Sequence, residues 1–211
     1  MKNDYRNTKY CPILKEISLK KTALDIKIRK EHPKVKIMYN QVKLTRSPYK
    51  PLFMKIYNHK CSYCGNAIDN IGTILFEIDH YICKSSFLSN EESGKMNNLV
   101  LACYDCNRSK DDLLITGDYI NTLHPDNEII KSVFFRDDMY YIRITDKYKE
   151  DQFINEFYNQ LKLGYQLRRL DYLLMNMRGL CEKLKDKPEA DKLNVALNKL
   201  QSKRNRLLYK S

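Results

Sequence analysis

Four of the seven cysteines form two close pairs, Cys61-x-x-Cys64 and Cys103-x-x-Cys106, with 38 residues between the pairs. Two thiolates three residues apart can grip one metal ion through a tight turn, and two such turns complete a tetrahedral site. We therefore expect a Zn²⁺ bound by Cys61, Cys64, Cys103 and Cys106. Because four thiolates leave no open coordination position, this zinc is expected to be structural. The alternative is four free buried thiols. We interpret the remaining cysteines as ordinary thiols: Cys11, Cys83 and Cys181.

Two residues with catalytic potential lie between the cysteine pairs. Asp79 and His80 follow the apolar run 74–78. A carboxylate at the end of a strand can bind a hard cation such as Mg²⁺. His80 would point to the other side of the strand, where it could act on a water molecule. The alternative is an ordinary hydrogen-bonded pair at a strand end.

A second polar group directly follows the last cysteine. Asn107 offers a neutral oxygen ligand, while Arg108 and Lys110 offer contacts to phosphate. Taken singly, Asn107 could be a helix cap and the two basic residues could be ordinary surface charges. Their position beside a pair of zinc-binding turns favours a role in a site.

In order and spacing, these elements resemble the HNH endonucleases that carry a four-cysteine zinc site. The resemblance rests on Cys61-x2-Cys64, Asp79-His80, Asn97-Asn98-Leu99 and Cys103-x2-Cys106-Asn107-Arg108-x-Lys110. It covers about 50 residues of the chain, from Cys61 to Lys110. It implies a ββα-metal fold, in which two strands and one helix surround a single divalent cation, Mg²⁺ or Mn²⁺.

The resemblance also implies a role for each matching residue. His80 would be the general base, and Asn98 would order the loop that orients the histidine. Asp79 and Asn107 would bind the catalytic cation, with Asn107 standing where many members of the family have a histidine. Lys110 would add charge stabilisation to the reaction.

These residues together predict a metal-dependent HNH endonuclease that hydrolyses DNA phosphodiester bonds. The alternative is a non-catalytic zinc module that binds nucleic acid or a partner protein, which would need the cysteines but not Asp79, His80 and Asn107. The size and layout of the chain also resemble PtuB, the HNH subunit of Septu-type anti-phage systems, which works with an ATPase partner subunit. Homing, phage and restriction enzymes share such a layout.

The elements that must position these residues predict an α+β fold. We expect strands at residues 74–78 and 98–102, a helix at 106–114, and a short helix at 52–58 after a break at Pro48 and Pro51. Residues 133–144 favour a hairpin that turns at Asp137-Asp138. Leucines recur at helical spacing after residue 166 and again after Lys187-Pro188, which predicts a helical hairpin. The expected segments are a basic N-terminal arm (1–50), an HNH nuclease core (51–120), a hairpin with a connecting helix (121–163), and a C-terminal helical hairpin (164–211).

The charge of +12 is unevenly distributed. Residues 1–60 hold 16 Lys and Arg against 4 Asp and Glu, whereas residues 61–120 hold 4 against 9. A basic arm suits the DNA backbone, because neutralising phosphates releases condensed counterions. The expected phosphate contacts are Lys20, Lys21, Lys27, Arg29 and Lys30. The alternative is that the tail holds DNA through Lys199, Lys203, Arg204 and Arg206, while the arm binds a partner.

Composition limits the class of protein. The chain has 211 residues, of which 43% are hydrophobic and 30% charged, so it can bury a core. It contains no run of 18 apolar residues, and the basic N-terminus lacks the apolar stretch of a secretory signal. We therefore expect no membrane association and a cytoplasmic location.

Overall fold

The centre of the molecule is a small sheet joined to one helix. The computed structural model describes residues 4–207, except the side chains of residues 68, 71 and 73. Strands β1 (Phe76–His80) and β2 (Leu99–Cys103) pair in antiparallel register, with Phe76 opposite Cys103 and His80 opposite Leu99. Helix α6 (Tyr104–Lys110) follows β2 directly and packs against both strands. This arrangement confirms the predicted α+β fold with a ββα centre.

The strand and helix of this centre follow from local sequence. Every residue of β2 is buried, and its apolar run is typical of a strand covered on both faces. Helix α6 is shorter than the expected 106–114, because Asp111 adopts a left-handed φ of 44° and ends it after Lys110. The two strands lie within one or two residues of the expected positions.

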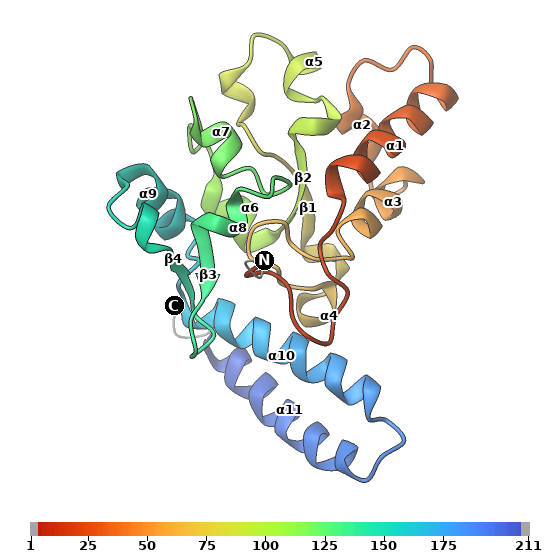
Figure 1. Cartoon of the computed structure of the whole chain (residues 1–211). Coiled ribbons are helices and arrows are strands. Elements are labelled where there is room, and N and C mark those ends of the chain that lie inside the picture. Colours follow the sequence, from red (N-terminus) through yellow and green to blue (C-terminus); the bar gives the residue numbers. More distant parts are fainter. Residues whose placement is uncertain (1–3, 208–211) are drawn as a thin grey trace.

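The basic N-terminal segment, residues 4–60, is folded onto the centre. It contains α1 (Ile17–Glu31), α2 (Met38–Val42) and α3 (Tyr49–Ile56), which lie together beside β1 and β2 (Figure 1). On α1 the residues Ile17, Leu24 and Ile28 are buried, and the basic side chains occupy mainly the opposite face. The segment is thus part of the hydrophobic core, with one charged surface.

The prediction that Lys21 of α1 contacts a DNA phosphate is wrong. The side chain of Lys21 is 4% exposed, and its Nζ lies 2.6 Å from Oδ2 of Asp126, which is also buried. The same ammonium donates a hydrogen bond to the carbonyl of Leu99 on β2, at 2.7 Å. The Asp126 carboxylate also accepts a hydrogen bond from the hydroxyl of Tyr57 on the N-terminal segment. The position of Lys21 in the sequence of α1 does not reveal that its side chain is buried.

A second lobe lies on the other side of the centre. It comprises α8 (Ile130–Val133), the antiparallel strands β3 (Phe134–Arg136) and β4 (Ile142–Ile144), and α9 (Gln152–Gln160). The hairpin is where the sequence predicted it, but its loop extends over residues 137–141. The Asp137 carboxylate accepts hydrogen bonds from the backbone N–H groups of Met139 and Tyr141, which explains the wider turn.

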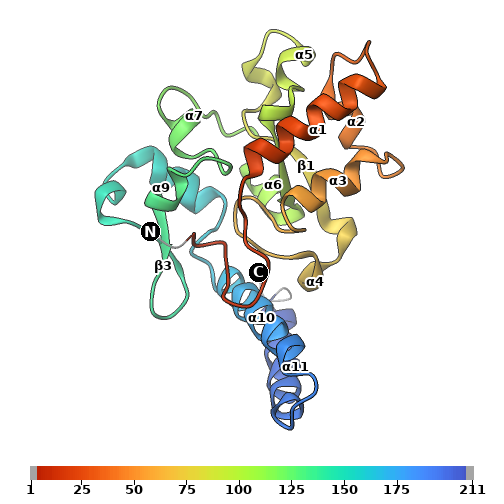
Figure 2. The same cartoon turned by 45° about the vertical axis from the view of Figure 1, so that its right-hand side comes forward.

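The C-terminal helices form a hairpin that projects from the body. Helices α10 (Gln166–Lys183) and α11 (Glu189–Leu207) run antiparallel, and both views show them extending away from the rest (Figures 1 and 2). Leu170 and Leu174 are buried, as the predicted stripe requires. A buried ion pair between Arg204 Nε and Asp171 Oδ1, at 2.8 Å, crosses the two helices. The alternative prediction that Arg204 contacts DNA is therefore wrong.

Short elements complete the described chain. They are α4 (Ile68–Ile71), η1 (Thr73–Leu75), η2 (Lys84–Ser86), α5 (Asn90–Ser93), η3 (Met96–Asn98), α7 (Tyr119–Thr122) and η4 (Asp146–Tyr148). Within residues 4–207, no helix has both the length and the apolar character that a membrane crossing requires.

The buried Lys21 gives a test of this packing. We expect Lys21→Ala to lower the free energy of unfolding by about 3 kcal/mol, because it leaves the Asp126 carboxylate buried without its counter-charge. Lys30→Ala, at an exposed position of the same helix, should change it by no more than about 0.5 kcal/mol. Urea unfolding of zinc-saturated protein measures both. Equal stability of the two variants would contradict the buried ion pair.

Candidate active site and zinc cluster

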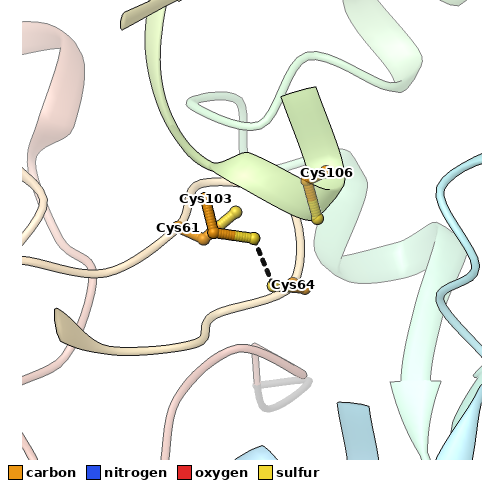
Figure 3. Close-up of side chains that lie close together, drawn as sticks. All are labelled: Cys61, Cys64, Cys103 and Cys106. Carbon is orange, nitrogen blue, oxygen red and sulfur yellow. Dashed lines mark hydrogen bonds between the residues drawn. The ribbon is translucent and has the colours of Figure 1, made fainter. Parts of the chain in front are cut away.

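The two cysteine pairs converge to a single cluster. The Sγ atoms of Cys61, Cys64, Cys103 and Cys106 all lie within 4.8 Å of one another, and all four residues are buried (Figure 3). The Sγ atoms of Cys64 and Cys103 are 3.8 Å apart. In a Zn²⁺ tetrahedron with bonds of about 2.3 Å, neighbouring sulfurs lie about 3.8 Å apart. The donor set, its spacing and its burial therefore fit a structural zinc ion.

The cluster joins two distant parts of the chain. Cys61 and Cys64 belong to a turn that ends at Gly65, whose φ of 76° suits glycine. Its N–H bonds the carbonyl of Cys61, and the N–H of Ser62 bonds the carbonyl of Leu101 on β2. Cys103 ends β2, and Cys106 lies in the first turns of α6. A metal at this cluster would hold the turn before β1 to the junction of β2 and α6.

One arginine from the C-terminal hairpin reaches the cluster. Nη1 of Arg168 lies 3.8 Å from Sγ of Cys103 and 3.7 Å from Oδ2 of Asp105, and the residue is 3% exposed. Burial alone would lower the pKa of Arg168, but the nearby thiolates hold that pKa well above its ordinary value. The arginine thus offsets negative charge beside the sulfurs.

The first residue of the predicted catalytic pair, Asp79, is held by two neighbours. Its Oδ2 accepts a hydrogen bond from the hydroxyl of Tyr63 at 2.6 Å, and its Oδ1 lies 3.4 Å from Nζ of Lys110. Burial raises the pKa of Asp79 to about 6, although Lys110 and Tyr63 both act in the opposite direction. The carboxylate is thus fixed in orientation and only slightly exposed.

Helix α6 lies over the same face of β1. Asn107 donates a hydrogen bond from Nδ2 to the carboxylate of Glu77, two residues before Asp79. Arg108, whose side chain is 66% exposed, also lies near Glu77, at 3.7 Å. Because alternate residues of a strand share one face, Glu77 and Asp79 both face α6. The amide oxygen of Asn107 and these two carboxylates form the candidate cation site.

His80 occupies the other side of the strand. Its Nε2 is buried and has no hydrogen-bond partner among residues 4–207, while its ring lies 4.2 Å from the ring of Tyr39, measured between centroids. Burial lowers the pKa of His80 to about 4, and the nearby charges of Lys84, Lys110 and Lys43 act in the same direction. The imidazole is therefore neutral near pH 7, the state that a general base requires.

Asn98 connects the two ends of the loop between the strands, residues 81–98. Its Oδ1 accepts a hydrogen bond from the N–H of Ile82 at 2.9 Å, and its Nδ2 donates to the carbonyls of Ile82 and Ser93. The carbonyl of Asn98 also accepts from the N–H of Tyr81, the residue after His80. These contacts are the ones expected of a residue that orders this loop, and its effect on catalysis stays a prediction.

Lys110 is placed differently from the exposed phosphate contact that its sequence position suggests. It is 1% exposed, and its ammonium donates to the carbonyls of His80 and Tyr81 besides pairing with Asp79. It can therefore position the strand end and its carboxylate, while Arg108 remains at the surface. Glu77 is not among the site residues expected from the sequence. Its position two residues before Asp79, on one strand face, is the signal that points to it.

Comparison with protein families agrees with this geometry. The family model described as HNH endonuclease matches residues 61–113, which include the cysteine cluster, β1, β2 and α6. This segment, about a quarter of the chain, therefore matches an HNH domain, and its four-cysteine cluster fits the zinc-binding type. A search of curated proteins and a search of solved structures each found no match.

The cluster predicts one tightly bound Zn²⁺ per chain. Cys103→Ser should lose this zinc and give unfolded or insoluble protein, because structural zinc supplies folding free energy on the order of 10 kcal/mol. Cys181→Ser, which alters a cysteine outside the cluster, should retain both zinc and solubility. Elemental analysis of protein purified without added zinc measures the ratio. A ratio near zero in the unaltered protein would exclude the zinc site.

Proposed function

We propose that this protein is a metal-dependent endonuclease that hydrolyses DNA phosphodiester bonds. The observation that carries the proposal is the arrangement of oxygen ligands and an imidazole at the end of β1. Glu77 and Asp79 face α6 together with Asn107, and the neutral His80 lies at the end of the same strand. Oxygen ligands next to a neutral imidazole are the combination that hydrolysis of a phosphodiester requires.

The candidate cation site suits Mg²⁺ or Mn²⁺, which prefer carboxylate and amide oxygens. Asp79 and Asn107 would hold the ion, and Glu77 would either join them or orient Asn107 through their hydrogen bond. A bound ion would supply charge stabilisation to the scissile phosphate and to the leaving oxygen. Such an ion is separate from the zinc, whose four thiolates fill its coordination shell.

The residues of the chain carry the proton chemistry. His80 takes a proton from water, and the hydroxide attacks phosphorus in line with the 3′ oxygen. The bond between phosphorus and that oxygen breaks, and the 3′ oxygen takes a proton from solvent to leave as a hydroxyl. Lys110 and Asn98 act indirectly. Lys110 fixes Asp79 and the carbonyl of His80, and Asn98 fixes the loop that follows. Arg108 remains available to contact a phosphate on the surface.

A non-catalytic zinc module that binds nucleic acid or a partner protein is the second candidate. Such a module needs the cysteines, but it needs neither a neutral imidazole at the end of β1 nor the amide of Asn107 beside the carboxylates of that strand. The presence of Asp79, His80 and Asn107 together therefore favours the enzyme.

The biological setting is proposed from layout. An HNH domain followed by helices resembles the PtuB subunit, which supports a cytoplasmic role in anti-phage defence with an ATPase partner subunit. The projecting α10–α11 hairpin gives such a partner an accessible surface. Copurification with the product of a neighbouring ATPase gene tests this setting independently of nuclease activity.

His80 gives the direct test of catalysis. We expect His80→Ala to lower the rate of plasmid nicking with Mg²⁺ or Mn²⁺ by at least about 10² to 10⁴-fold, which is the usual contribution of a general base. Zinc content and DNA binding should stay the same, because the His80 side chain makes no hydrogen bond to another described residue. Near-normal nicking by this variant would remove His80 from the mechanism.

Two surfaces of the protein are candidates for DNA binding, and each offers three exposed basic residues for an equal change of charge. Lys27, Arg29 and Lys30 are exposed on α1, and Lys199, Lys203 and Arg206 are exposed on α11. We expect the triple alanine variant of α1 to flatten the plot of log affinity against log salt, by about 0.9 for each lost contact to duplex phosphate. Filter binding at several salt concentrations measures the slope. An unchanged slope for the α1 variant, with a flatter slope for the α11 variant, would assign DNA binding to the hairpin.

A further inference from the structure

The N-terminal segment contributes side chains to the surroundings of His80. The rings of Tyr39 and His80 lie 4.2 Å apart between centroids, with an angle of 52° between their planes. Tyr39 belongs to α2, which precedes the HNH match at residues 61–113. The nearest aromatic neighbour of the proposed general base therefore comes from outside the matched domain.

Helix α2 is fixed on the loop between β1 and β2. Met38 and Val42 are fully buried, and the N–H of Tyr39 donates to the carbonyl of Gly94 at 3.1 Å. A Cβ at Gly94 would lie 2.5 Å from Cγ2 of Ile37, so glycine is needed for this close approach. The position of Tyr39 is thus set by packing on both sides, which is what a site residue needs.

Two lysines converge on the Tyr39 ring. Lys43 lies one helical turn after Tyr39, and Lys84 lies on the loop after β1. The Nζ atom of each is 4.9 Å from the ring centroid. Both side chains are exposed, and among residues 4–207 neither ammonium has a carboxylate within ion-pair distance. A cation–π contact leaves ammonium N–H groups free to donate elsewhere.

Two like charges beside a buried imidazole repel one another, and an anion bound between them removes that repulsion. The anion that must come to His80 is the DNA strand. We propose that Lys43 and Lys84 bind a phosphate that flanks the scissile bond, and that Tyr39 is the positioning residue that aligns both lysines with His80. This inference rests on the proposed nuclease function and extends the active site to the N-terminal segment.

The test pairs lysine variants with altered DNA. The substrate is a duplex oligonucleotide with a mapped cleavage site, in which single phosphates near that site are replaced in turn by neutral methylphosphonates. Lys43→Ala and Lys84→Ala should each lower the single-turnover rate about tenfold on natural DNA. On the duplex whose contacted phosphate is neutral, both variants should cleave as fast as the unaltered protein.

Lys34→Ala is the matched control, because Lys34 is exposed on the same N-terminal segment and makes no ion pair with another described residue. It should cleave every duplex at the unaltered rate. Tyr39→Phe should also be active, since the ring is retained, whereas Tyr39→Ala should lose activity and respond to the same methylphosphonate as the lysine variants. A destabilised fold would instead slow all duplexes equally.

The outcomes separate this inference from the nuclease proposal. Equal losses for Lys34→Ala and Lys43→Ala, or losses that persist at every methylphosphonate position, would overturn the phosphate contact while leaving the nuclease intact. If the unaltered protein cleaves no DNA, the nuclease proposal fails. Binding of an unmodified duplex oligonucleotide in the absence of divalent metal then tests the contact. A tenfold weaker affinity for Lys43→Ala and Lys84→Ala, absent for Lys34→Ala, supports the contact, and equal affinities overturn it.

Discussion

Four cysteine sulfurs held within 4.8 Å of one another are the constraint on which the structure depends. Without a cation, the sulfurs would have to stay protonated or repel one another at this distance. With Zn²⁺, the same four atoms fix the turn at Cys61–Cys64 to the junction of β2 and α6. Asn107 lies in α6, directly after that junction. Strand β1, which ends with Asp79 and His80, pairs with β2. The geometry of the candidate cation site therefore depends on the cluster, because two short strands and one short helix bury too little apolar surface to be stable alone.

Buried charged side chains connect the other segments of the chain to this centre. Lys21 of α1 reaches the carbonyl of Leu99 on β2, Arg168 of α10 reaches Cys103, and Lys110 holds Asp79 from within the HNH domain. Each charge is costly to bury unless a partner offsets it, and for Lys21 and Arg168 that partner lies in another segment. The segments outside residues 61–113 thus complete the domain. They supply counter-charges and hydrogen bonds that the short HNH segment lacks, and they keep the end of β1 rigid.

The sequence allowed a close prediction of the features that depend on local spacing. The cysteine pairs, the two strands, the α6 helix, the 133–144 hairpin and the C-terminal helices are all found near their expected positions. Features that depend on tertiary partners were missed. Lys21 and Lys110 look like surface lysines until Asp126 and Asp79 are seen beside them. Glu77 and Tyr39 enter the site only because α6 and α2 pack where they do. A residue's type and neighbours in sequence do not specify which distant segment will cover it.

The contact between Arg168 and the cysteine cluster bears on the order in which the molecule can assemble. During synthesis the four cysteines leave the ribosome before Arg168 does, since Arg168 follows Cys103 by 65 residues. The nascent chain can therefore bind a metal before the arginine that offsets the charge of the sulfurs arrives. In a chain interrupted before α10, the cysteine cluster would lack the contact with Arg168. The hairpin thus brings its positive charge to the cluster only after the cysteines have been synthesised.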